Sequence, residues 1–160
     1  MKTIKICIWV IILYIMQCVL TPYIRIMGAA PEFLFVFTLC TAYFSKDAKY
    51  SFGVGAVCGL LAGSMYGIGA AFYLIIYVLS VIAVSAFSDI IYTKIYLPII
   101  PIALVMSFLE NSLFFLSNKI LSVTYAGALI SVILPVTIYN TAFATLIGFF
   151  VKKLYVDRGN

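Results

Sequence analysis

The sequence contains no histidine, and only 9% of its 160 residues are charged. Soluble domains carry roughly 25% charged residues, so this chain has too few polar side chains to cover a surface that faces water. The lack of histidine excludes haem and zinc sites with histidine ligands, and it excludes Ser-His and Cys-His catalysis. Because 66% of the residues are hydrophobic, we expect an integral membrane protein.

Uncharged stretches divide the chain into segments that are long enough to cross a bilayer. A spanning helix needs roughly 20 apolar residues, so the length allows about six spans and no sizeable extramembrane domain. We predict an all-α integral membrane protein, a single transmembrane domain folded as a polytopic bundle of six transmembrane helices. The last span contains Pro135, which predicts either one kinked helix or a lead-in segment followed by a span from about Ser131. The predicted spans are approximately residues 6–24, 31–45, 50–66, 70–88, 97–117 and 128–151.

Basic residues are distributed unevenly over the predicted loops. With six spans, Arg25 and Lys119 lie on one side, and the other eight basic residues lie on the side that carries both termini. Cytoplasmic loops of membrane proteins are enriched in Lys and Arg, so we predict that both termini are cytoplasmic. Five spans would place the two basic termini on opposite sides. The eight residues are Lys2, Lys5, Lys46, Lys49, Lys94, Lys152, Lys153 and Arg158.

Cysteine and aspartate do not form the patterns of a metal or catalytic site. Cys7, Cys18, Cys40 and Cys58 occur singly in apolar stretches, without CxxC spacing, and we interpret them as membrane-buried hydrophobic residues. The three aspartates fall in predicted loops or in the C-terminal tail, so no aspartate pair lies within the spans. We therefore predict that the protein is not an enzyme and that it uses no cofactor or metal.

Glycines recur at four-residue intervals in the third predicted span, at Gly55, Gly59, Gly63 and Gly67. This spacing places glycines on one slowly drifting stripe of a helix, where the lack of side chains lets another helix approach closely. The stripe predicts a tight helix contact, either with another span of this chain or with the helix of a partner. Gly67 alternatively belongs to the following turn.

Two glutamates lie in or beside the predicted spans. An ionised carboxylate near the bilayer centre costs about 2.5–3.5 kcal/mol on insertion scales, so Glu110 is a candidate for binding a cation, carrying a proton or contacting a partner. The alternative is that Glu110 lies toward the outer interface and is hydrated. Nothing nearby in the sequence supplies a second acid. We interpret Glu32, beside Pro31, as a residue that caps the start of a helix.

The last predicted span carries further polar residues, Tyr139 and Asn140. An amide inside a membrane needs a hydrogen-bond partner, so we expect Asn140 to face another helix, of this chain or of a partner. The candidate helix-packing or partner-interface residues are Gly55, Gly59, Gly63, Glu110, Pro135, Tyr139 and Asn140.

Three segments of the chain share a pattern with one known family. Gln17–Phe33 (QCVLTPYIRIMGAAPEF) is similar to a Gln-Ser pair, a proline and a Gly-x-x-Pro-Asp motif between the first two spans. Gly55–Tyr73 (GAVCGLLAGSMYGIGAAFY) is similar to a glycine-rich third span, and Leu134–Leu154 (LPVTIYNTAFATLIGFFVKKL) to a Pro and Tyr-Asn pattern in the last span. Together they resemble the rod shape-determining protein MreD family. Cys18 and Glu32 replace the usual serine and aspartate.

This resemblance implies a non-enzymatic scaffold of the bacterial plasma membrane that acts in cell shape and cell-wall morphogenesis. It implies that the chain is part of the elongasome, binds the single-span protein MreC and helps to couple MreB filaments to peptidoglycan synthesis. The synthesis partners would be the RodA glycosyltransferase and its penicillin-binding transpeptidase partner. No nucleic-acid partner is expected.

The alternative is the substrate-binding component of an energy-coupling-factor vitamin transporter, a class that is also small and has six spans. Those proteins typically carry small residues at four-residue spacing in the first span, whereas the first span here (ICIWVIILYIMQCVL) is bulky. A vitamin site would use polar or aromatic groups near the outer ends of the last spans. Residues that supply such groups are Glu110, Asn111, Asn118 and Tyr125.

Overall fold

The described residues of the computed structural model are 2–25, 29–45, 47–66, 70–91, 97–120 and 132–155. Within these ranges the chain forms six α-helices and no β-strand, so the prediction of an all-helical protein is confirmed for this part. The helices are α1 (Lys2–Leu20), α2 (Phe33–Phe44), α3 (Ala48–Tyr66), α4 (Ala70–Ile91), α5 (Ile99–Ile120) and α6 (Leu134–Tyr155).

Four of these helices, α1, α4, α5 and α6, are long and apolar enough to cross a membrane. Their presence agrees with the prediction of a membrane protein, although six spans were predicted. Helix α3 has 19 residues but contains Lys49 and four glycines. Helix α2 has only 12 residues. At 1.5 Å per residue, α2 is about 18 Å long, little more than half of the ~30 Å hydrocarbon core.

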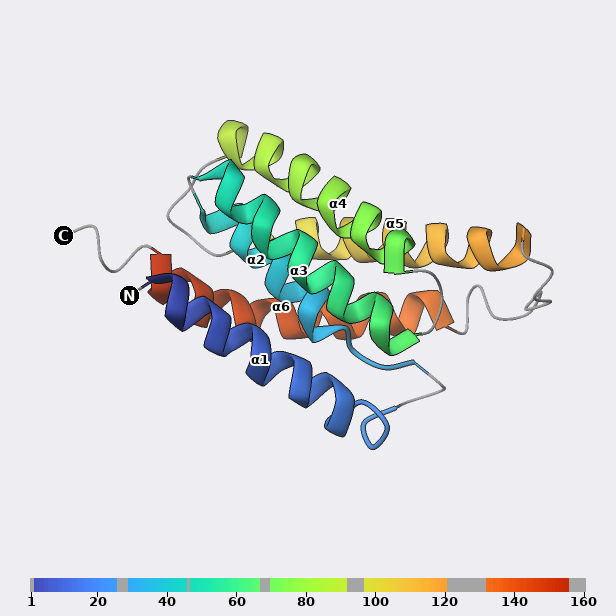
Figure 1. Cartoon of the computed structure of the whole chain (residues 1–160). Helices are drawn as coiled ribbons and strands as arrows, with labels where there is room; N and C mark the ends of the chain where they lie inside the picture. Colours follow the sequence, from blue (N-terminus) through green and yellow to red (C-terminus); the bar gives the residue numbers. More distant parts are fainter. Residues whose placement is uncertain are drawn as a thin grey trace.

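Helix α2 lies at the centre of the bundle, and the other five helices surround it (Figure 1). Its sequence, FLFVFTLCTAYF, has no polar face, and all 12 of its residues are buried. A helix that is apolar all round is stable only when it is covered on every side. Aromatic contacts supply part of this cover: Phe33 packs edge-on against Phe143 of α6, and Phe35 against Tyr77 of α4, with ring centroids 4.9 and 5.1 Å apart.

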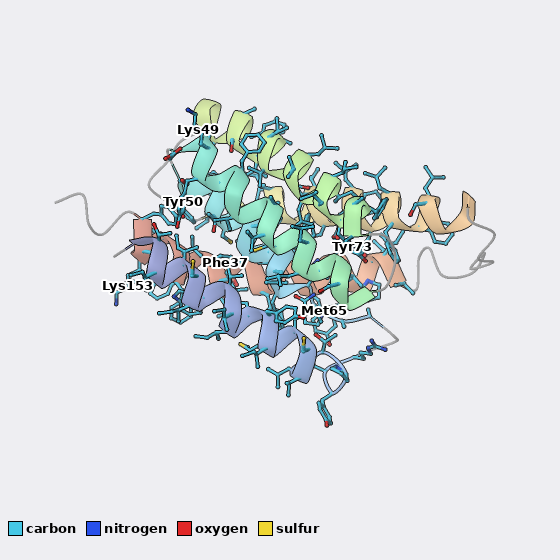
Figure 2. The ribbon with its side chains drawn as sticks, in the orientation of Figure 1. Phe37, Lys49, Tyr50, Met65, Tyr73 and Lys153 are labelled. Atoms are coloured by element: carbon cyan, nitrogen blue, oxygen red, sulfur yellow. The ribbon has the colours of Figure 1, made fainter. Side chains whose placement is uncertain are left out.

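The two ends of the bundle carry different helix termini. The start of α1 and the end of α6 lie at one end (Figure 1). Lys49 and Lys153 lie at that same end, whereas Met65 and Tyr73 lie toward the opposite one (Figure 2). The outward faces of α1, α4 and α5 expose large apolar side chains, among them Ile11. Such faces suit contact with lipid or with other membrane helices.

The helix bounds differ from the predicted spans mainly near the ends of the chain. Helix α1 starts at Lys2 and ends at Leu20, and turns follow it up to Ile24. Pro135 lies in the first turn of α6, a position that suits proline because its missing N–H would have no helical partner there. The part of the last predicted span before residue 132 lies outside the described residues, as does Gly67.

Candidate functional site

Helix α2 begins inside the protein, where its first N–H groups cannot reach water. The first four N–H groups of any helix lack partners within that helix. Here the Glu32 N–H donates to Asn140 Oδ1 at 2.8 Å, and the Leu34 N–H donates to Gln17 Oε1 at 3.0 Å. Both amide side chains are fully buried. Side chains from α1 and α6 therefore replace the water that would solvate an exposed helix start.

Helix α6 also holds the connection that leads from α1 to α2. The hydroxyl of Tyr139 donates to the Ile24 carbonyl oxygen at 3.2 Å. The next residue, Asn140, accepts the hydrogen bond from Glu32. Two adjacent residues of α6 thus bind this connection at two separate points, so the polar pair in the last span serves contacts within the chain.

Two carboxyl groups meet beside the start of α2. The side chains of Glu32 and Glu110 are within hydrogen-bonding reach of each other, and Asn140 also contacts the Glu32 carboxyl. Asn111 Nδ2 lies 3.3 Å from Glu110 Oε2 and donates to it. Glu32 and Glu110 are only 9% and 3% exposed. Two carboxylates in one buried site cannot both be ionised without a compensating positive charge.

This arrangement decides between the two alternatives for Glu110 and refines the interpretation of Glu32. Glu110 is buried rather than hydrated, and a second acid does face it, because the fold brings Glu32 alongside. Glu32 occupies the position that precedes the first residue of α2, but its side chain makes no capping hydrogen bond to that helix. Its carboxyl instead approaches Glu110 and Asn140.

The glycine stripe lies at a different interface, where α3 packs against α4. A Cβ atom added to Gly59 would lie 2.9 Å from the Leu74 Cα, and one added to Gly63 would lie 2.6 Å from the Ala70 Cα. At Gly55 the nearest atom would be Val81 Cγ2, at 2.8 Å. Of the two alternatives for the stripe, a second span of the same chain is the one present here.

The sequence-predicted residues therefore divide into two groups and one separate position. Glu110, Tyr139 and Asn140 gather around the start of α2, whereas the three glycines lie between α3 and α4. Pro135 is half-buried in the first turn of α6. The candidate residues did not include Gln17, although it is the only glutamine in the chain and lies in an otherwise apolar run. A single polar amide among apolar residues was the signal that could have identified Gln17 as a buried hydrogen-bonding residue.

No protein-family model, no curated protein and no solved structure matches this chain. Within the part of the chain that the structure describes, no group of three or more Cys, Asp or Glu side chains is placed to hold a metal ion. The functional argument therefore depends on the sequence pattern and on the buried polar residues around α2.

Proposed function

We propose that the chain is a non-enzymatic scaffold of the bacterial cell-elongation machinery. It would cross the plasma membrane six times with both termini in the cytoplasm. It would bind MreC and help to couple MreB filaments to peptidoglycan synthesis by RodA and its transpeptidase partner. The resemblance of three sequence segments to the MreD family is the starting point for this proposal.

The observation that carries the proposal is the meeting of the family-like residues in space. Gln17 and Glu32 come from the first segment, and Tyr139 and Asn140 from the last. All four take part in holding the start of α2 or the connection that precedes it. Residues from two of the three segments thus meet at one buried helix start, which supports the resemblance.

The glycine-rich segment supports the proposal in a second way. Gly59 of this segment lies against the Tyr73 carbonyl oxygen, which belongs to the same segment; an added Cβ would be 2.9 Å from it. The segment therefore contributes residues to both α3 and α4, and these two helices pack against each other. The proposed family pattern then accounts for two helix contacts, one polar and one made of small residues.

The proposed topology agrees with the distribution of basic residues on the described helices. Lys49 and Lys153 lie at the end of the bundle where α1 starts and α6 ends (Figure 2). Six crossings would bring both termini to one side, and cytoplasmic sides are rich in Lys and Arg. A reporter that is active only outside the cytoplasm, fused after Asn160, should therefore remain inactive.

The test of the scaffold role is purification of the tagged protein from its native membrane in a mild detergent. We expect MreC, a single-span protein, to co-purify together with cell-wall synthesis proteins. The variant Asn140→Leu, which removes the acceptor for the Glu32 N–H, should reduce this recovery. Ser112→Ala is the matched control, because its hydroxyl bonds only to its own helix, at Phe108 O.

Other partners would contradict the scaffold role. Recovery of a pair of cytoplasmic ATPases with a membrane coupling protein would instead establish the vitamin-importer component. Of the residues considered for a vitamin site, Glu110 lies close to Glu32, and Asn111 donates to Glu110 Oε2 at 3.3 Å and to the Ser107 carbonyl oxygen at 2.9 Å. The Asn118 side chain and Tyr125 lie outside the described residues.

A further inference from the structure

We propose that Glu32 and Glu110 form a binding site for one monovalent cation, either a proton shared by the two carboxyl groups or a sodium ion held between them. The site lies between the start of α2 and the middle of α5. This inference does not depend on the scaffold function, since it concerns only the charge of the buried pair and the unpartnered hydroxyls on the same helix faces.

The charge of the pair is the first argument. Both side chains are more than nine-tenths buried, and burial strongly disfavours an ionised carboxylate that has no counter-charge. The start of α2 carries a partial positive charge that offsets part of one negative charge. The second negative charge needs a cation. One monovalent cation supplies that charge.

The described residues around the pair provide no such cation. Helix α1 contributes the neutral Gln17, and α6 contributes Asn140 and Tyr139, whose hydroxyl is bound to the Ile24 carbonyl. The two carboxyls lie close to each other, Asn140 lies beside the Glu32 carboxyl, and Asn111 donates to Glu110 Oε2. Among the described residues, no Lys or Arg is found beside either carboxyl. The compensating charge must therefore come from outside these residues.

Buried oxygen atoms without partners are the second, independent argument. Ser107 precedes Glu110 by three residues on α5, and Thr137 precedes Asn140 by three residues on α6, so each lies on the same face as the cluster residue. The hydroxyls of Ser107 and Thr137 are buried and have no hydrogen-bond partner.

Other hydroxyl groups of the same two helices behave differently. They donate to carbonyl oxygens of their own helix at 2.6–2.8 Å. Only the two hydroxyls on the cluster side lack such bonds among the described Ser and Thr residues of α5 and α6. Buried polar atoms are nearly always satisfied, and hydroxyl and carboxylate oxygens are suitable ligands for hard cations. The bonded residues are Ser112, Ser117, Thr141 and Thr145.

The test compares the stability of the purified protein at several pH values in sodium and choline salts, with a chelator present throughout. An unfolded chain loses its carboxyl protons at about pH 4, whereas a proton shared by the folded pair would be released only at higher pH. Stability is then greatest at low pH and is lost as the pH rises. Over the range in which only the folded protein keeps that proton, the unfolding midpoint should fall by roughly 3–5 °C per pH unit.

The two cations give different results in this experiment. If the site takes sodium, sodium chloride should restore the midpoint at high pH while choline chloride does not, and Ser107→Ala should weaken the restoration. Ser112→Ala, on another face of α5, should leave it unchanged. If the site takes only a proton, the two salts should give the same falling midpoint.

Variants at the pair make the proposal falsifiable. Glu110→Gln and Glu32→Gln each keep the side-chain shape but leave a single carboxyl, so either variant should remove most of the pH dependence. Asp157 follows α6 in the sequence, so Asp157→Asn should retain the pH dependence. A wild-type midpoint that is independent of both pH and sodium would overturn the proposal. So would a pH dependence that is undiminished in the two glutamine variants.

Discussion

The α3–α4 interface and the start of α2 join helices by opposite means. Between α3 and α4, the absence of side chains at Gly59 and Gly63 lets the two backbones touch. At the start of α2, long polar side chains such as Gln17 reach from neighbouring helices to the backbone. The first contact depends on packing alone, so an added side-chain atom should weaken it. The second depends on directed hydrogen bonds, so the loss of a polar side chain should weaken it.

Enlarging a glycine of the α3–α4 interface should have the largest effect. Gly59→Ala places a methyl group against the backbone of Leu74 and should lower the free energy of unfolding by about 1–3 kcal/mol, the usual cost of overpacking. Gly59→Leu should prevent the folded protein from accumulating. Both effects can be measured by thermal unfolding and by yield in detergent.

Gly53 supplies the matched control for this prediction. It lies on the same helix, and an added Cβ atom would meet nothing within 4 Å. Gly53→Ala should leave stability unchanged or raise it by up to ~1 kcal/mol, because alanine favours the helix. Equal losses in Gly53→Ala and Gly59→Ala would show that helix propensity, rather than backbone contact, explains the glycines.

Removing a polar side chain at the start of α2 should have an intermediate effect. Gln17→Leu keeps the bulk of the side chain but leaves the buried Leu34 N–H without its acceptor, which should cost about 1–3 kcal/mol. Cys18→Leu, at the adjacent exposed position, is the control and should change little. If Gln17→Leu is as stable as the wild type, the hydrogen bond from the Leu34 N–H to Gln17 does not stabilise α2.

The smallest effect is expected at the half-buried Tyr139. Tyr139→Phe removes one hydroxyl donor to the Ile24 carbonyl oxygen and should cost about 0.5–1.5 kcal/mol. Tyr23→Phe is the control, since the Tyr23 side chain is 84% exposed. A cost well above that range would mean that the connection before α2 moves when this bond is lost.

The sequence predicted the class of fold well because composition alone carries that information. Few charges and long apolar runs require helices that satisfy their own backbone groups. The glycine spacing likewise predicted a tight contact, yet it did not identify α4 as the helix that covers it. Spacing marks one face of a helix, whereas the neighbour of that face depends on the packing of the whole bundle. The number of membrane crossings and the side of the termini remain predictions.

The pairing of Glu32 with Glu110 was outside the reach of sequence reasoning. Each glutamate was interpreted within its own segment, where Pro31 suggested a cap and the apolar surroundings suggested an isolated acid. Their contact depends on α2 lying against α5, which a single sequence does not encode in any local pattern. They are the only two glutamates in the chain, but this fact alone does not predict that they are in contact.

The hydrogen bonds at the start of α2 join residues that are synthesised at very different times. The ribosome makes Glu32 early, but the acceptor for its N–H, Asn140, follows 108 residues later. Until then the Glu32 N–H lacks this acceptor, and an unsatisfied backbone group costs free energy in hydrocarbon. We therefore expect a chain truncated before residue 140 to be less stable than the full chain and to be degraded faster by quality-control proteases.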